Sequence, residues 1–241
     1  MAHETRVEII EAAERLFAQH GMAGVSLREI IAAAGQRHKA AVRYHFGSKQ
    51  RLIEEILNHR VDVIDRHRSA LLMAVERDAD GDCLRRIVEA QVRPLFDLVQ
   101  PGSYWARFLA HLFQDAAYRH AVPADAPSRA AGRRIARLLR KALPEIPTGV
   151  LVLRRQAAWR LVIQEIAVHE RELAAGRRKA ASSAALARGL VDMVVGILSA
   201  PVSPTRRRPA AVAGDGSASS VPTGRNAGVH SQGHVRQRSQ S

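Results

Sequence analysis

The chain has little cysteine and few aromatic residues. Cys83 is the single cysteine, and aromatic residues make up 4% of the 241 positions. One cysteine cannot form an intramolecular disulfide, which excludes the disulfide-rich secreted class and suits a reducing cytoplasm. No run of about 18 apolar residues is present, so we expect no membrane-spanning helix and no membrane partner. The first residues, MAHETRVEII, lack the apolar segment of a signal peptide, so we expect a cytoplasmic protein.

The motifs of enzymes and metal sites are also missing. The sequence has 11 histidines but no H-E-x-x-H, C-x-x-C or G-x-S-x-G pattern, and His59 and His67 are not at a metal-ligand spacing. We therefore expect no catalytic residue, no metal site and no cofactor, against the rival hypothesis of an enzyme. The histidines are expected to be exposed or paired with nearby acids, as His169 is with Glu170 and Glu172.

Acidic residues are few compared with basic ones. Lys and Arg number 37 against 23 Asp and Glu, which gives a formal charge of +14. Such an excess suggests a polyanionic partner, nucleic acid first and an anionic membrane surface second. Charge alone leaves open the alternative of an ordinary solvated basic surface. Abundant alanine with few aromatics favours helix over strand.

Apolar residues recur at helical spacing through most of the chain, so we predict an all-α fold. Gly21, Gly47, the DADGD and PEIPT segments and Pro101-Gly102 mark the breaks. The expected helices, about nine with no strand, cover residues 5–20, 26–34, 37–43, 49–77, 83–99, 103–122, 128–143, 148–175 and 182–198. We divide the chain into an N-terminal helical domain at 1–48, a larger helical domain at 49–200, and a tail at 201–241.

The tail differs in composition from the rest of the chain. It contains no Leu, Ile, Met, Phe, Trp, Tyr or Cys and is rich in Pro, Gly, Ser and Arg. Because it can bury too little apolar area to offset its chain entropy, we predict that it is disordered. Its six Arg against one Asp would add non-specific attraction to DNA. A solvated tail without a role is the alternative.

The stretch from Ser26 to Lys49 predicts two short helices around a tight turn. Ser26 and Glu29 form the S-x-x-E pattern of a capping box. Gly35 follows an alanine run, at the place where a helix ends and a positive φ is useful. A second short, basic helix follows. This order is that of a helix-turn-helix motif, whose second helix enters the DNA major groove.

Residues 5–55 carry a longer pattern around this motif, formed by Thr5-Arg6, Ile9-Ile10, Ala12-Ala13, Leu16-Phe17, Gly21, Ser26-Leu27-Arg28-Glu29-Ile30, Ala34-Gly35, Tyr44-His45-Phe46, Ser48-Lys49 and Leu52. In order and spacing it resembles the TetR family of bacterial transcriptional regulators. The resemblance implies an all-helical dimeric repressor. Its first three helices and the start of the fourth would bind DNA, and the later helices would hold an effector pocket and the dimer interface.

Two departures from the family pattern fall in the recognition helix. Gly35 and Phe46 are eleven residues apart, one more than the usual family spacing. Arg43 also stands where an aromatic residue is usual. These departures leave the register of the recognition helix open by one residue.

We expect most DNA contacts in and near residues 37–51. This segment holds five cations and no acid, and such a charge attracts the phosphate backbone. Arg37, His38 and Lys39 open the recognition helix, where guanine edges can be read, while Gln36 can pair with adenine and Ala40 can meet a thymine methyl group. A solvated side chain is the alternative for each cation. The full set of candidates is Thr5, Ser26, Arg28, Gln36, Arg37, His38, Lys39, Ala40, Arg43, Tyr44, His45 and Lys49. Among these, Tyr44, His45 and Lys49 suit phosphate better than bases, and Thr5, Ser26 and Arg28 are further phosphate candidates. Phe46 is expected in the core.

An effector pocket is expected along the aromatic helix at 103–122, because aromatic walls with a few polar groups suit a small apolar or amphipathic ligand. Ordinary core packing is the alternative for each residue. The candidates on this helix are Tyr104, Trp105, Phe108, Leu109, His111, Leu112 and Phe113, and Trp159 is a similar candidate on the helix expected at 148–175.

A homodimer interface is expected on the last two helices, which are apolar on more faces than a lone surface helix needs. The candidates are Leu161, Val168, Leu186, Leu190, Val194 and Ile197. Dimerisation would also place two recognition helices about one helical turn of DNA apart, over a palindromic operator. The sequence thus predicts a regulator, most simply a repressor released by its effector. The rival is a non-specific basic binder of nucleic acid or membrane surfaces.

Overall fold

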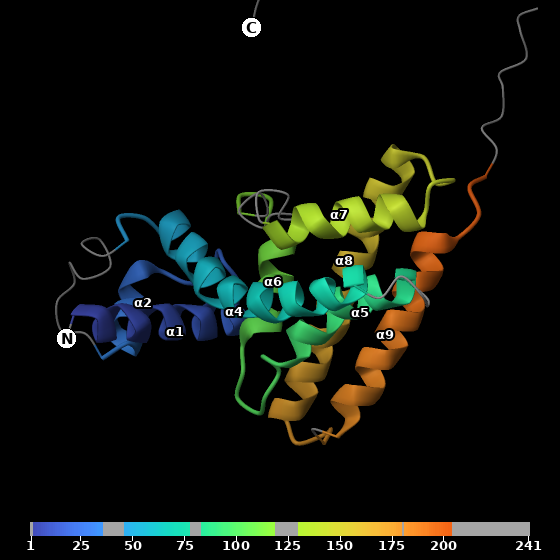
Figure 1. Cartoon of the computed structure of the whole chain (residues 1–241). Coiled ribbons are helices and arrows are strands. Elements are labelled where there is room, and N and C mark those ends of the chain that lie inside the picture. The colour runs from blue at the N-terminus through green and yellow to red at the C-terminus, as the bar shows by residue number, and fades with distance from the viewer. Residues whose placement is uncertain (1, 36–45, 78–82, 119–129, 180, 204–241) are drawn as a thin grey trace, which may run out of the picture. The chain divides into compact units, whose positions relative to one another are not determined.

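The computed structural model describes residues 2–35, 46–77, 83–118, 130–179 and 181–203. In these ranges the chain forms eight helices and no strand, which confirms the all-α prediction (Figure 1). They are α1 (Ala2–His20), α2 (Leu27–Ala33), α4 (Lys49–Arg77), α5 (Cys83–Phe96), α6 (Trp105–Gln114), α7 (Ala130–Ala142), α8 (Thr148–Ala174) and α9 (Ser182–Ser199). The predicted recognition helix at 37–43 and nearly all of the tail lie outside the described residues.

The start of the helix-turn-helix motif has the predicted local structure. The Ser26 hydroxyl accepts a 3.3 Å hydrogen bond from the Glu29 N–H, and the Glu29 carboxylate accepts a 2.7 Å bond from the Ser26 N–H. Gly35 has φ of +68°. Ser48 caps α4, since its hydroxyl accepts from the Arg51 N–H at 3.2 Å. The capping box, the glycine turn and the start of the long helix are therefore confirmed.

Helix α6 is shorter than the predicted span of 103–122. Ser103 does not cap it, because its hydroxyl donates instead to a carboxylate oxygen of Glu170 at 2.8 Å. At the other end Asp115 adopts an extended conformation, with φ of −82° and ψ of +115°. The Asp115 carboxylate accepts a 2.9 Å hydrogen bond from the Ala117 N–H, which closes a tight turn. The aromatic helix therefore ends at Gln114.

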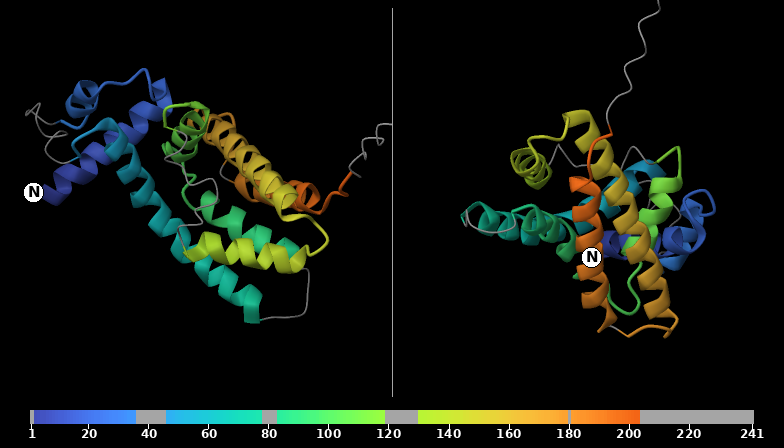
Figure 2. Two further views of the ribbon diagram at one scale, coloured as in Figure 1. Left: turned by 90° about the horizontal axis from the view of Figure 1, so that it is seen from above. Right: turned by 90° about the vertical axis from the view of Figure 1, so that its right-hand side faces the viewer.

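Residues 1–202 form one compact unit. We call residues 1–48 the head and residues 49–200 the body, although this division stays a prediction. Helix α1 packs on α2 and α4 within the N-terminal part, and it also packs on α6, which in turn packs on α8. Helix α5 lies between α4 and α9, and α8 and α9 lie side by side (Figure 2). Phe46 is buried, as predicted, and the Phe17 and Phe108 ring centroids, 6.2 Å apart, join α1 to α6.

Helix α9 is apolar and long enough, by length and composition, to cross a membrane, with a mean hydropathy of 1.4 over Ser182–Ser199. The sequence analysis expected no membrane-spanning helix and did not recognise this run as a candidate. The packed helix of an ordinary protein core passes the same test. One face of α9 is buried through Leu190, Val191, Val194 and Leu198, and Asp192 forms a 2.7 Å ion pair with Arg85 of α5. These contacts bury one face of α9 within the protomer, while 22% of the Ser182–Ser199 window is buried in all.

Candidate DNA interface and body cavities

Four of the twelve predicted DNA contacts fall on described residues. Ser26 and Arg28 are exposed near the start of α2, Thr5 is half-buried on α1, and Lys49 is half-buried at the start of α4. The other eight lie outside the described residues: Gln36, Arg37, His38, Lys39, Ala40, Arg43, Tyr44 and His45. The base contacts therefore stay a prediction from the sequence.

Lys49 has internal partners that the sequence analysis did not foresee. Its ammonium donates hydrogen bonds to the carbonyl oxygens of Met22 and Val25, the latter at 2.7 Å. It also lies 5.4 Å from the ring centroid of Phe17 and 5.9 Å from that of Tyr118. Burial lowers the pKa of Lys49. The two carbonyls carry no side-chain signal, so the sequence could not reveal this arrangement, and the phosphate contact of Lys49 stays a prediction.

Two ion pairs tie α1 to α4. Arg6 pairs with Glu55, and the Arg60 guanidinium donates to both carboxylate oxygens of Glu14, at 2.8 and 3.2 Å. Glu14 is only 3% exposed, whereas its neighbours Glu11 and Arg15 on the same helix are exposed. Helix α4 crosses the face that carries Glu14 and supplies Arg60 as the partner that a buried carboxylate requires.

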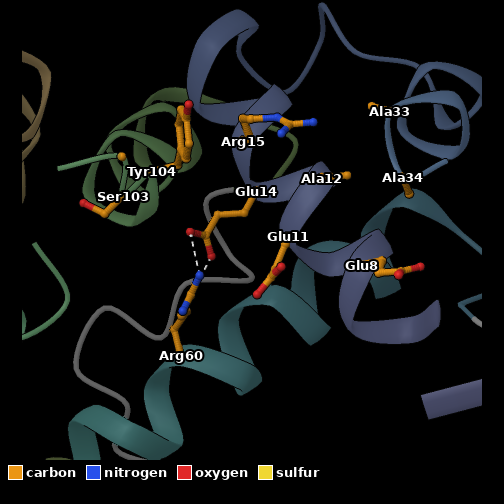
Figure 3. Close-up of a pocket in the computed structure, with 11 residues that line it drawn as sticks. Glu8, Glu11, Ala12, Glu14, Arg15, Ala33, Ala34, Arg60, Ser103 and Tyr104 are labelled. Atoms are coloured by element: carbon orange, nitrogen blue, oxygen red, sulfur yellow. Dashed lines mark hydrogen bonds and ion pairs between the residues drawn. The ribbon is translucent and has the colours of Figure 1, made fainter. Parts of the chain in front are cut away.

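A cavity of about 470 Å³ opens beside this ion pair (Figure 3). Its walls come from α1, the end of α2, α4 and the segment before α6. They are mainly polar, with three glutamates and two arginines. The lining residues are Glu8, Glu11, Ala12, Glu14, Arg15, Ala33, Ala34, Arg60, Gly102, Ser103 and Tyr104. Tyr104 is the one predicted effector residue among them.

The pH dependence of stability tests the burial of Glu14. Burial raises the pKa of Glu14 above its ordinary value of 4.5, and the Arg60 charge opposes this only in part. The stabilising contribution of Glu14 is therefore complete below its unfolded pKa and is lost as the pH rises through the higher folded pKa. We expect the unfolding free energy of the wild type minus that of Glu14→Gln to fall between pH 4 and pH 7, measured by urea denaturation. A difference that grows over this range would mean that Arg60 outweighs burial.

Four of the eight predicted effector residues lie in the core. Trp105, Phe108, Leu109 and Leu112 are buried, and the Trp105 and Phe108 rings stack with centroids 5.8 Å apart. Tyr104, His111 and Phe113 are half-buried. The structure does not bring these residues together around one described cavity, so their contact with an effector stays a prediction.

Trp159 lines a second cavity, between α5, α8 and α9. This cavity measures about 10 Å³ and is lined by Gln91, Val92, Arg155, Ala158, Trp159, Val162, Val194 and Leu198. Such a volume holds at most one water molecule. The sequence analysis missed Arg155, which is 8% exposed. The sequence did carry a signal for this residue. Arg155 lies one turn before Trp159, in a helix that is apolar on more than one side, so a buried cation could be expected there.

A buried carboxylate joins α8 to α6. Glu170 is 1% exposed. It accepts hydrogen bonds from the Ser103 hydroxyl (2.8 Å), the Ala106 N–H (3.3 Å), and the backbone and Nε groups of Arg107 (3.1 and 3.0 Å). A negative charge at the start of a helix also complements the helix dipole. Glu170 therefore caps α6 from a neighbouring helix.

The expected pairing of His169 with adjacent acids is wrong. His169 is buried, and its Nε2 lies 2.8 Å from the Ser183 hydroxyl of α9. Neighbours along a helix point in different directions, so Glu170 faces α6 while His169 faces α9. Burial lowers the pKa of His169. Among the described residues, no group of three or more His, Cys, Asp or Glu is placed to hold a metal ion.

The predicted dimer residues divide into two groups. Leu190 and Val194 are buried within the protomer. Val168 is 43% exposed, and Leu161, Leu186 and Ile197 are half-buried, so these four have side chains that a partner can reach. Leu153 and Met193 are further exposed apolar residues on the same two helices, at 62% and 44%.

Two family models match the chain. The family described as "Bacterial regulatory proteins, tetR family" matches residues 9–56, and "Tetracyclin repressor-like, C-terminal domain" matches residues 89–196. The first covers α2 and most of α1, and the second covers α6 to α8 with most of α5 and α9. Both halves of the compact unit are thus matched.

Curated relatives are similar over the N-terminal part. The probable regulator ArpR of Pseudomonas putida is 36% identical over 87 residues, which cover 36% of this chain and 40% of that protein. A transcriptional repressor of Mycobacterium tuberculosis is 35% identical over 107 residues, which cover 44% of this chain and 54% of that protein. The chain thus matches only about half of the length of these relatives, or less.

A solved TetR family regulator from Marinobacter aquaeolei has the same fold. It is 18% identical, with a TM-score of 0.54 over 81% of this chain and 95% of that chain. The two family matches fall on successive parts of one all-α unit that has this fold, and the chain belongs to the TetR family of bacterial regulatory proteins.

Proposed function

We propose that the chain is a sequence-specific DNA-binding transcriptional regulator that acts as a homodimer. The observation that carries this proposal is the capped α2, which ends at Ala33 and is followed by the positive-φ Gly35. The sequence then continues into a segment with five cations and no acid over residues 37–51. A recognition helix formed by that segment, as the sequence predicts, can present basic side chains to base edges and phosphates. Repression, rather than activation, is supported by the name of the Mycobacterium tuberculosis relative.

Mapping the DNA sites that the protein occupies in its source genome tests this function. We expect discrete sites that share a palindromic sequence. Uniform occupancy that follows only the salt concentration would instead identify the non-specific basic binder.

Dimerisation through α8 and α9 is supported by their exposed apolar side chains. Val168 belongs to the predicted interface, whereas Val152 is similarly exposed, at 39% against 43%, on the same helix. At 3.6 residues per turn the two valines lie about 160° apart around α8. They therefore form a matched pair for testing which face of α8 meets the partner.

We expect Val168→Glu to convert the dimer into a monomer, because a carboxylate buried in an apolar interface has no partner. Val152→Glu should leave the dimer intact. Light scattering after gel filtration should give twice the chain mass of 26.4 kDa for the wild type and for Val152→Glu, and a single chain mass for Val168→Glu. A dimer of Val168→Glu would contradict this interface.

The effector is proposed to be a small apolar or amphipathic molecule that binds in the body. The cavity beside Trp159 has mainly apolar walls, and the indole N–H of Trp159 is buried without a hydrogen-bond partner. This combination favours a ligand that carries a hydrogen-bond acceptor on an apolar frame. Because ligand pockets usually measure about 300–1,000 Å³, the body must open here to admit one.

Release from the operator then follows from linkage. An effector that prefers the opened body weakens operator binding by the same factor by which DNA weakens effector binding. A ligand that saturates the body without changing operator affinity would contradict this part of the proposal.

A further inference from the structure

The Lys49 ammonium is enclosed by three segments of the chain. Phe17 belongs to α1, Met22 and Val25 to the loop before α2, and Tyr118 to the turn after α6. Two carbonyl oxygens and two ring faces thus surround one cation. We call these four residues the Lys49 cage.

This enclosure is unexpected at the first residue of a helix. The N-terminus of a helix attracts anions and repels cations, so a lysine there is best placed when its charge meets a phosphate or carboxylate. An ammonium has three N–H donors, and the carbonyls of Met22 and Val25 accept two of them. A DNA phosphate would therefore compete with these two carbonyls and the two rings for the Lys49 ammonium.

The cage combines parts of the head and of the body. Phe17, Met22 and Val25 belong to the head, whereas Tyr118 is held by the turn that Asp115 closes after α6. The opposite end of α6 is bound to α8 through Glu170. Helix α8 also carries Trp159, beside the body cavity. A displacement of α6 relative to the head therefore moves the Tyr118 ring relative to the Lys49 ammonium.

We propose that Lys49 is a latch between body and head, which either holds Tyr118 in the cage or binds an operator phosphate, but not both. The inference rests on the proposed DNA-binding function and adds a regulatory contact to it. A body conformation that keeps Tyr118 over Lys49 withholds one phosphate contact from DNA. A conformation that withdraws Tyr118 supplies that contact. The Tyr118 contact and DNA therefore compete for one side chain.

Nuclear magnetic resonance of the lysine ε-CH2 groups tests the latch directly. In the free protein the ring currents of Phe17 and Tyr118 should shift the Lys49 signal upfield, and its absence in Lys49→Met assigns it. When the full chain binds a duplex selected from a random-sequence library, the signal should move to the position of an exposed lysine. A signal that stays upfield in the bound protein overturns the latch.

Matched variants of Tyr118 give a second readout. Tyr118→Leu removes the ring and should tighten binding to the same duplex about two- to five-fold, the range expected for one exposed cation–π contact. Tyr118→Phe keeps the ring and should bind as the wild type does. When Lys49 is already replaced by Met, the further change Tyr118→Leu should not alter the affinity. Compared with the wild type, Lys49→Met should show a salt dependence of log K that is less steep by about 0.9, as expected for one lost phosphate contact.

The outcomes separate the two proposals. Equal binding by Tyr118→Leu and Tyr118→Phe, or a gain from Tyr118→Leu that persists in Lys49→Met, overturns the latch while DNA binding stands. A chain that selects no duplex from the library overturns the proposed function, and the latch with it.

Discussion

Glu170→Ala should lower the free energy of unfolding by about 3–5 kcal/mol, the usual cost of removing one partner from a buried ion pair. The Glu170 side chain has no exposed surface, and the Arg107 side chain that it meets at 3.0 Å is 12% exposed. Truncation leaves that guanidinium without its carboxylate, and it removes the acceptor of two backbone N–H groups at the start of α6.

Urea denaturation followed by circular dichroism measures this effect, with Glu172→Ala as the control. Glu172 lies two residues further along α8 and pairs with Arg178 at 2.6 Å, but its side chain is 28% exposed. A surface pair of this kind contributes at most about 1 kcal/mol. If Glu170→Ala is no more destabilising than Glu172→Ala, then Glu170 does not hold α6 to α8.

Replacing Arg37 and Lys39 together by Ala should remove about 2–6 kcal/mol of the preference for a selected site over mixed-sequence DNA, because each base contact contributes about 1–3 kcal/mol of discrimination. Both residues lie outside the described ranges, so this expectation rests on the sequence alone. Competition binding with labelled selected duplex and unlabelled mixed-sequence duplex measures the preference.

The matched control removes two cations from the body. Arg140 and Lys141 are exposed on α7, and their double replacement by Ala changes the net charge by the same amount. It should leave the preference for the selected site intact. If Arg37 and Lys39 prove no more important than this pair, the assignment of base contacts to Arg37 and Lys39 is wrong.

The sequence predicted those features whose signals are local. Residues within a few positions of one another determine the capping box of Ser26 and Glu29 and the glycine turn at position 35. The span of α4, from Lys49 to Arg77, follows from a repeated pattern along the chain. Apolar periodicity over 49–77 and the breaks on either side were enough to place the longest helix with its observed bounds.

The interactions that join the elements could not be predicted in this way. Glu14 reads as a surface acid in its own helix, and its partner Arg60 is 46 residues away. Glu170 meets Ser103 at a separation of 67 residues, and Lys49 meets Met22 at 27. Each depends on which helices cross, and helix periodicity carries no information on that.

The candidate ligand residues show a second limit. Trp105 and Phe108 share an aromatic helix with Tyr104, but the first two are buried in the core and Tyr104 borders the polar cavity beside Glu14. An aromatic cluster has the same sequence pattern whether it packs against a neighbouring helix or surrounds a ligand. Only the packing of α6 between α1 and α8 separates these cases.

Selection of duplexes from a random-sequence library by the full chain tests the central claim most directly. A dimeric helix-turn-helix regulator predicts enrichment of one inverted repeat, with half-sites about one helical turn apart. Binding that follows only the salt concentration, with no sequence enriched over the starting library, would contradict sequence-specific regulation by this chain.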